Sequence, residues 1–214
     1  NLLINLFVGL SVGTNVVVAR DLGAGRHDNV SRSVHTSMTL ALISGVVMTV
    51  FGTVMVRQLL EWMSSPTDVI DLATVYLRIY FFGMPALLTY NFGAAILRAQ
   101  GDTRRPLYFL FLSGVVNVVL NLFFVIVLHM DVAGVALATV LAQTISAFLC
   151  LWKLLRMRDV FDLTLHYLNP CSAPIANIIR IGVPSGITQA IFSVAMLVVQ
   201  SLTNSFGEMV IACN

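Results

Sequence analysis

A long run without charge constrains this chain more than any other feature. Residues 106–128 (PLYFLFLSGVVNVVLNLFFVIVL) contain no charged side chain over about 23 positions. A helix of about 20 apolar residues crosses the ~30 Å hydrocarbon core of a bilayer, and a helix satisfies its own backbone hydrogen bonds there. The run therefore predicts a membrane-spanning helix.

Two amides lie inside this run, and a second apolar run follows a short break at residues 129–131. Asn117 and Asn121 are four residues apart and share one helix face. In the second run, small residues recur every four positions, at Gly134, Ala138 and Ala142, with Thr139 beside them. Small residues at this spacing allow helix backbones to approach closely, so the two runs predict a tightly packed pair of helices with polar groups between them.

The composition extends this prediction to the whole chain. Hydrophobic residues make up 58% of it and charged residues 10%, whereas about 25% of the residues of a soluble domain are charged. Six spans are expected: residues 2–19, 38–56, 73–97 and 107–128, a fifth that ends at Trp152, and a sixth from residue 181. The predicted fold class is an all-α polytopic membrane protein, in which His27 and His35, before the second span, are exposed.

Prolines and polar residues mark particular positions within the spans. Pro85, near the middle of the third span, and Pro184, at the opening of the sixth, predict helix kinks because proline lacks a backbone donor. One face of the sixth helix carries a polar stripe formed by Gln189, Ser193, Gln200 and Asn204. A stripe facing lipid would be unstable, so we interpret these four residues as a substrate path.

Charged residues predict the orientation and argue against other classes of protein. Ten of the twelve Lys and Arg residues lie within residues 20–32, 98–105 and 153–180, which makes these loops cytoplasmic by the positive-inside rule and suggests a plasma (inner) membrane location. The net charge of +2 gives no reason to expect nucleic acid as a partner. No carboxylate falls within a span, and the three cysteines lack the C-x-x-C spacing of metal sites. We expect no cofactor or metal beyond a possible Na⁺ site, and no obligate protein partner.

One motif offers an enzymatic alternative. Residues 9–13 (GLSVG) match the nucleophile-elbow pattern G-x-S-x-G, which requires a strand-to-helix turn. Here the pattern lies within a predicted helix, on which Asn5, Gly9 and Gly13 share one face. No histidine is available within the hydrocarbon as a base. We therefore interpret the motif as a packing surface and predict that the protein is not an enzyme.

Several short motifs together resemble the multidrug and toxic compound extrusion (MATE) transporter family. They are VGTNVVVARDLGAG after the first span, ILRAQGDTRRP after the third, DVAGVALATVLAQ in the fifth and IGVPSGITQAI in the sixth. The resemblance implies a twelve-helix, two-lobe transporter of which this chain covers helices two to seven. Residues 1–158 would form most of the N-terminal lobe, residues 159–180 a cytoplasmic linker between the lobes, and residues 181–214 the first helix of the C-terminal lobe.

The resemblance also implies a cation site and a function. Asn117 and Thr139 match an Asn and a Thr of the family's first-lobe cation site, whereas Asn121 stands where that site has an Asp. The same three residues can also be interpreted as forming hydrogen bonds that only hold the helices together. The implied function is a secondary antiporter that exports small organic cations or drugs in exchange for Na⁺ or H⁺. A lipid-linked oligosaccharide flippase, which would need a basic cavity open to lipid, and a non-transporting scaffold, which would not need the polar stripe, remain alternatives.

Overall fold

The computed structural model describes residues 2–62, 67–157 and 172–205, which form helices and short turns with no strand among them. The helices are α1 (Leu2–Gly23), α2 (His27–Trp62), α3 (Thr67–Phe82), α4 (Met84–Ala99), α5 (Arg104–Leu122), the π-helix η1 (Phe123–Val127), α6 (Asp131–Arg156) and α7 (Ser172–Ser205). The predicted all-α membrane fold is confirmed. Within the described residues, four helices are long and apolar enough to cross a membrane, and α3 with α4 forms a fifth, broken span. Residues 2–19 of α1, which carry no charge, match the first expected span.

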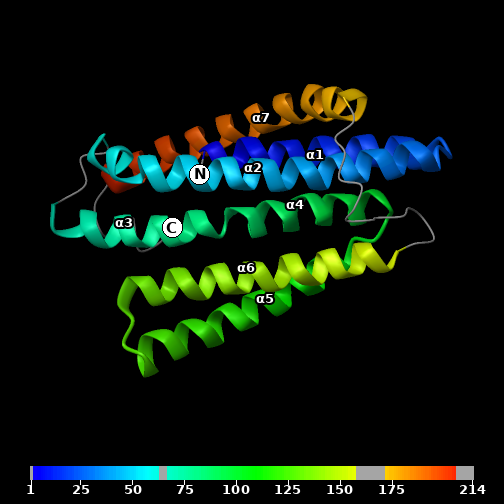
Figure 1. Ribbon diagram of the computed structural model, residues 1–214. Coiled ribbons are helices and arrows are strands. Elements are labelled where there is room, and N and C mark those ends of the chain that lie inside the picture. The colour runs from blue at the N-terminus through cyan, green and yellow to red at the C-terminus, as the bar shows by residue number, and fades with distance from the viewer. Residues whose placement is uncertain (1, 63–66, 158–171, 206–214) are drawn as a thin grey trace.

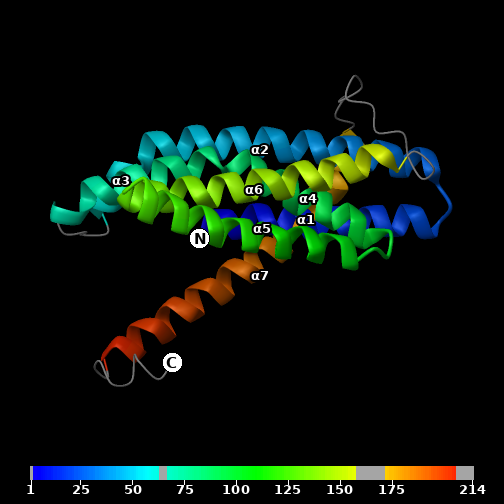
Figure 2. The same ribbon diagram turned by 90° about the horizontal axis from the view of Figure 1, so that it is seen from below.

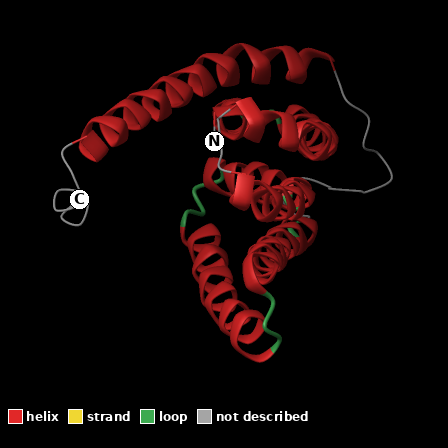
Figure 3. Ribbon diagram, turned by 90° about the vertical axis from the view of Figure 1, so that its left-hand side faces the viewer, coloured by secondary structure: helices red, strands yellow, loops and turns green. Residues whose placement is uncertain are grey.

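Helix α4 lies at the centre of the bundle. It packs against α1 and α2 on one side and α6 on the other, while α5 lies outside α6 and α7 lies outside α1 (Figures 1 and 3). Much of α4 is buried, including Phe92, Ile96 and Leu97. In contrast, α5 buries little more than Pro106 and Ser113. The α5–α6 hairpin therefore forms one edge of the described bundle, and α7 forms the opposite edge.

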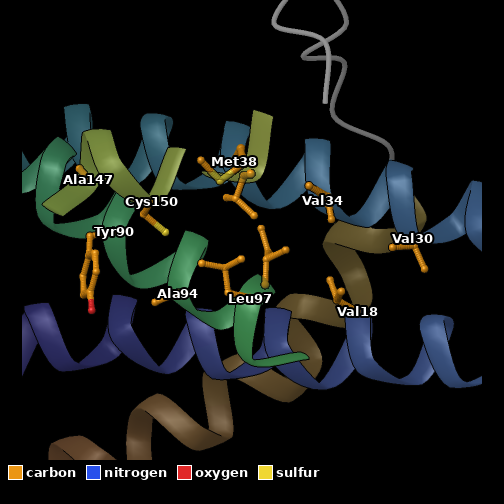
Figure 4. Close-up of a cluster of buried hydrophobic side chains, with 11 residues drawn as sticks. Val18, Val30, Val34, Met38, Tyr90, Ala94, Leu97, Ala147 and Cys150 are labelled. Carbon is orange, nitrogen blue, oxygen red and sulfur yellow. The ribbon is translucent and has the colours of Figure 1, made fainter. Parts of the chain in front are cut away.

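The main hydrophobic core lies toward the end of the bundle that carries the basic loops. Figure 4 shows Val18 from α1, Val34 and Met38 from α2, Leu97 from α4 and Cys150 from α6 pointing toward one another. These residues come from the last turns of α1, α4 and α6 and the first turns of α2. Side chains at this end therefore hold four helices together.

Gly83 interrupts the third span, and α3 and α4 meet there at an angle of 44°. Pro85 has no N–H to donate to the carbonyl of Phe81, four residues earlier. The Thr49 hydroxyl of α2 replaces that donor: its oxygen lies 2.8 Å from Phe81 O and 2.9 Å from Gly45 O. Gly45 lets α2 approach, because a Cβ there would lie 2.6 Å from Pro85 Cα. Packing against α2 thus supports the break.

Two helix boundaries differ from the sequence-based expectation. Helix α2 begins at His27 rather than near residue 33. The side chain of His35 is 8% exposed, so the expectation that it is exposed was wrong, whereas His27 is exposed. Helix α7 begins at Ser172, so residues 172–180 of the expected linker are helical, and residues 159–171 lie outside the described residues. Pro184 lies inside α7, which continues through it as helix.

Candidate functional site

Three hydrogen bonds join the facing sides of α5 and α6 at successive turns. They run from Ser146 Oγ to Phe109 O (3.4 Å), from Ser113 Oγ to Ala142 O (2.7 Å) and from Asn117 Nδ2 to Thr139 Oγ1 (3.3 Å). On α5 the partners are four residues apart, so they share one face. The predicted polar contact between the two apolar runs is confirmed.

Small residues on α6 bring the two helices close enough for these bonds. Gly134, Ala138 and Ala142 are buried in the structure. A Cβ at Gly134 would lie 3.0 Å from Phe124 Cβ in η1, so a larger side chain would push the hairpin apart. The four-residue spacing therefore has the packing role that the sequence predicts.

Asn121, Asn117 and Thr139 form a continuous hydrogen-bonded chain. Asn121 Nδ2 donates to Asn117 Oδ1 at 3.0 Å, and Asn117 Nδ2 donates to Thr139 Oγ1. The Thr139 hydroxyl donates in turn to Val135 O at 3.0 Å on its own helix. All three side chains are half-buried. The structure brings together the three residues that the sequence singled out as candidate ligands.

Within this hydrogen-bonded series of three side chains, one oxygen has no partner among the described residues. Asn121 Oδ1 is buried and accepts no hydrogen bond from any described residue. Leaving a buried acceptor unsatisfied costs about 1–3 kcal/mol, which a bound cation or water would relieve. Amide and hydroxyl oxygens are ligands that hard cations accept. None of the three side chains takes up a proton near neutral pH, so this cluster alone can hold a cation but cannot carry a proton.

The helix break lies next to the cluster. A small cavity of about 10 Å³ is lined by Thr139, Val140 and Gln143 of α6, Tyr80 of α3, Leu87 of α4, and Gly83 between α3 and α4. This volume accommodates about one water molecule. Thr139 therefore stands between the amide pair and the interrupted span. Sequence reasoning missed this neighbourhood, because nothing in the sequence of α6 indicates that it packs against residue 83.

A π-helix begins two residues after Asn121. Segment η1 covers Phe123–Val127 and ends with Leu128 N bonded to Phe123 O at 3.3 Å. Such wide turns are rare and occur mostly as single turns in longer helices. The amide pair thus occupies the last regular turns of α5. No sequence signal predicted the change of helix type.

The predicted substrate path on α7 lies apart from this cluster. Helix α7 packs on α1, at the edge of the bundle opposite α5 (Figure 3). Asn5 Nδ2 of α1 donates to Ser193 Oγ, which donates to Gln189 O at 3.0 Å. Gln200 and Asn204 lie on the helical backbone of α7, but their side chains are outside the described part of the chain. Ser193 therefore joins two helices, and the structure does not bring the stripe to Asn117.

Glycines form the contact between α1 and α7. Gly9 and Gly13 face Gly182 and Gly186 so closely that a Cβ at Gly9 would overlap the Gly186 backbone, and one at Gly13 would lie 2.5 Å from Ile178 O. The nucleophile-elbow match lies within this contact. Ser11 is 1% exposed and donates to Val8 O of its own helix at 2.6 Å. Residues 9–13 are therefore a packing surface, as predicted.

Broken membrane-spanning helices with polar groups between helices are features that many secondary transporters share. The MatE family model matches residues 1–123, more than half of the chain. The chain belongs to the MatE family, which confirms the resemblance seen in its motifs.

Relatives and solved structures agree with this membership. The probable multidrug resistance protein YoeA of Bacillus subtilis (strain 168) is 31% identical over 215 residues, covering 97% of this chain and 46% of that protein. An inward-facing MATE transporter of the MOP superfamily matches with a TM-score of 0.84 and 31% identity, over 91% of this chain and 44% of that one. An outward-facing MATE transporter of the same superfamily matches with a TM-score of 0.86 and 30% identity, covering 96% of this chain and 46% of that protein. The chain spans about half the length of the proteins it matches.

Proposed function

We propose that this chain supplies the cation-binding part of an antiporter that exports organic cations or drugs in exchange for Na⁺ or H⁺. The observation that carries the proposal is the chain of Asn121, Asn117 and Thr139, whose buried Asn121 Oδ1 lacks a donor among the described residues. The multidrug resistance named for YoeA supports a drug as cargo. The protein would act in the plasma (inner) membrane as a transporter and not as an enzyme.

The proposed arrangement places residues 1–158 in the N-terminal lobe and residues 181–214 at the start of a C-terminal lobe, joined through residues 159–180. Helix α7 supports this division. Its C-terminal part extends away from the other helices (Figure 2), and α7 exposes Ile191, Phe192 and Met196. An apolar helix surface of this kind suits packing against lipid or further helices. Pro85 and Pro184 would then mark bends used in alternating access.

Three neutral ligands hold a cation weakly, so the proposed site also requires a carboxylate from another part of the full-length protein. That carboxylate would carry the proton if H⁺ is the coupling ion, since no amide can do so near neutral pH. A membrane potential of 100 mV supplies about 2.3 kcal/mol for each charge that crosses. Exchange of one monovalent ion for one monovalent organic cation moves no net charge, so the potential contributes only when more than one charge enters for each cation exported. In a one-for-one exchange the concentration gradient of the ion alone drives export.

Drug efflux from vesicles that contain the full-length protein, under an imposed Na⁺ or H⁺ gradient, tests this function. Asn117→Ala and Thr139→Ala should each reduce gradient-driven efflux and raise the Na⁺ concentration needed for half-maximal stimulation, because each removes one oxygen ligand. Ser113→Ala is the matched control: it removes a bond of the same hairpin, to a backbone carbonyl one turn away.

Two results would contradict the proposal in different ways. If both variants keep the ion dependence of the unmodified protein, Asn117 and Thr139 are packing residues and coupling lies elsewhere. If no gradient drives efflux of any organic cation, antiport itself is wrong, and the lipid-linked oligosaccharide flippase becomes the better reading.

A further inference from the structure

A groove between α5 and α6 lies at the end of the hairpin away from its turn. Its volume is about 300 Å³, and its walls come from the first turns of α5 and the last turns of α6. Three cations line it, Arg105, Lys153 and Arg156, together with three aromatic side chains, Tyr108, Phe109 and Trp152. No carboxylate lines it among the described residues.

The groove keeps an unbalanced positive charge. Arg105 Nη1 forms an ion pair with Asp102 Oδ2 at 2.9 Å, outside the groove lining. Neither Lys153 nor Arg156 forms an ion pair with any described residue. Among the described residues, no carboxylate pairs with Lys153 or Arg156 in competition with an anion in the groove.

Two of the three cations, Arg105 and Arg156, are held in position by neighbouring side chains. The Arg156 guanidinium carbon lies 4.7 Å from the centroid of the Trp152 ring, a cation–π contact that limits the side chain to one region. Asp102 also accepts a bond from Arg105 N at 3.2 Å, which fixes the carboxylate that orients the Arg105 side chain. A planar guanidinium held in this way suits the paired oxygens of a phosphate.

The position of the groove indicates which anion it meets. It lies at the ends of two helices that are long and apolar enough to span a membrane, Arg104–Val127 and Val132–Arg156, where such helices meet the headgroups. Tyr108 and Trp152 are aromatic residues of the kind that sit at headgroup level. Next to them α5 and α6 expose Leu107, Phe111 and Phe148, each about two-thirds exposed. When a lipid places its phosphate in the groove, its acyl chains can pack against these exposed residues. A free phosphate ion has no acyl chains and cannot make this contact.

We propose that this groove binds the headgroup phosphate of an anionic phospholipid, with Lys153 and Arg156 contacting the phosphate and Trp152 packing at headgroup level. Basic pockets between membrane helices are known to bind such headgroups. The proposal concerns a surface distinct from the Asn117 cluster and does not depend on antiport.

Quenching of Trp152 fluorescence by brominated lipids tests the proposal on the full-length protein in vesicles. The fluorescence of Trp152 is obtained by subtracting the fluorescence of the Trp152→Phe variant from that of the unmodified protein. Brominated phosphatidylglycerol should quench this signal at a lower mole fraction than brominated phosphatidylcholine. Each of Lys153→Gln and Arg156→Gln should reduce the preference roughly fivefold, because a basic residue near an anionic surface contributes ~1 kcal/mol.

Two matched controls separate charge at this groove from charge in general. Arg104→Gln removes an exposed cation beside Arg105 that does not line the groove, so it should leave the preference unchanged. Arg156→Lys keeps the charge and should keep most of the preference. Lys153 and Arg156 contribute little to the buried core, so their variants should fold, and a thermal transition near that of the unmodified protein checks this.

Three outcomes would overturn the proposal. Equal quenching of Trp152 by the two lipids would show that the groove does not select an anionic headgroup. A preference that survives the double variant Lys153→Gln/Arg156→Gln would place the selectivity elsewhere. If the two lipids quench equally and inorganic phosphate changes the Trp152 signal of the protein in a neutral detergent, the groove takes a free anion instead of a lipid.

Discussion

At the residue scale, Thr49 shows how a helix break is stabilised in a membrane. Pro85 leaves the Phe81 carbonyl without its helical donor, and the Thr49 hydroxyl lies 2.8 Å from that carbonyl. In hydrocarbon no water can take that role. The hydroxyl of one helix therefore compensates for the missing amide proton of another.

Thr49→Val should destabilise the protein, because valine keeps the shape and loses the donor. A hydrogen bond between membrane helices contributes about 0.6 kcal/mol on average and up to about 1.7, so the thermal transition in detergent should fall by a few degrees. In a Pro85→Ala background the loss should be smaller, since alanine restores an N–H that can reach Phe81 O. Thr53→Val is the control, because its hydroxyl bonds only carbonyls of its own helix. Equal losses in both backgrounds would show that the two residues act independently.

At the element scale, two kinds of helix contact hold this chain together. The α5–α6 hairpin uses a ladder of side-chain hydrogen bonds over small residues. The α1–α7 pair uses glycine against glycine, reinforced by the bond from Asn5 to Ser193. Both contacts rely on close backbone approach, which is how membrane helices associate where the lipid supplies no hydrophobic drive.

Gly9→Ala should separate α1 from α7, because the added methyl group would meet Gly186 backbone, which cannot turn aside as a side chain can. We expect a loss of about 1–3 kcal/mol, as for overpacking in other close-packed contacts, measured as a lower thermal transition. Gly114→Ala is the matched control, since nothing lies within 4 Å of its added Cβ. An unchanged transition in Gly9→Ala would mean that the two helices are not in close contact in the membrane.

At the scale of the whole molecule, the order of the helices places the α5–α6 hairpin and α7 on opposite edges, with α1 and α4 between them (Figure 3). The same chain matches both an inward-facing and an outward-facing transporter at similar TM-scores. The packing of this chain therefore resembles that of the matched part in both of those transporters.

Cysteine labelling tests the predicted orientation of the basic loops. Arg104 and His129 flank the span formed by α5 and η1, so cysteines at these positions lie on opposite membrane surfaces. In a background without native cysteines, an impermeant reagent added outside intact cells should label position 129 and miss position 104. Permeabilised cells provide the control, in which both positions should react. Labelling at 104 alone in intact cells would reverse the orientation.

Much of this architecture could be predicted from the sequence because it follows from local chemistry. Long apolar runs with few or no charges located the spans, since hydrocarbon disfavours unpaired charge over a known thickness. The four-residue spacing from Asn117 to Asn121 placed both amides on one face, and the small residues of α6 indicated a close partner. Thr139 could be joined to this pair from sequence because α6 follows α5 after a short turn.

Partners distant in the chain could not be found in this way. A helix that is apolar on all sides carries no stripe to show which face meets which neighbour. Only the tertiary structure places Thr49 against Phe81, Gly9 against Gly186 and Ser193 against Asn5. The sequence by itself determined which segments enter the membrane, because transfer into hydrocarbon depends on each segment's own residues. The tertiary structure decided which segments touch, because close packing depends on the shapes of two surfaces at once.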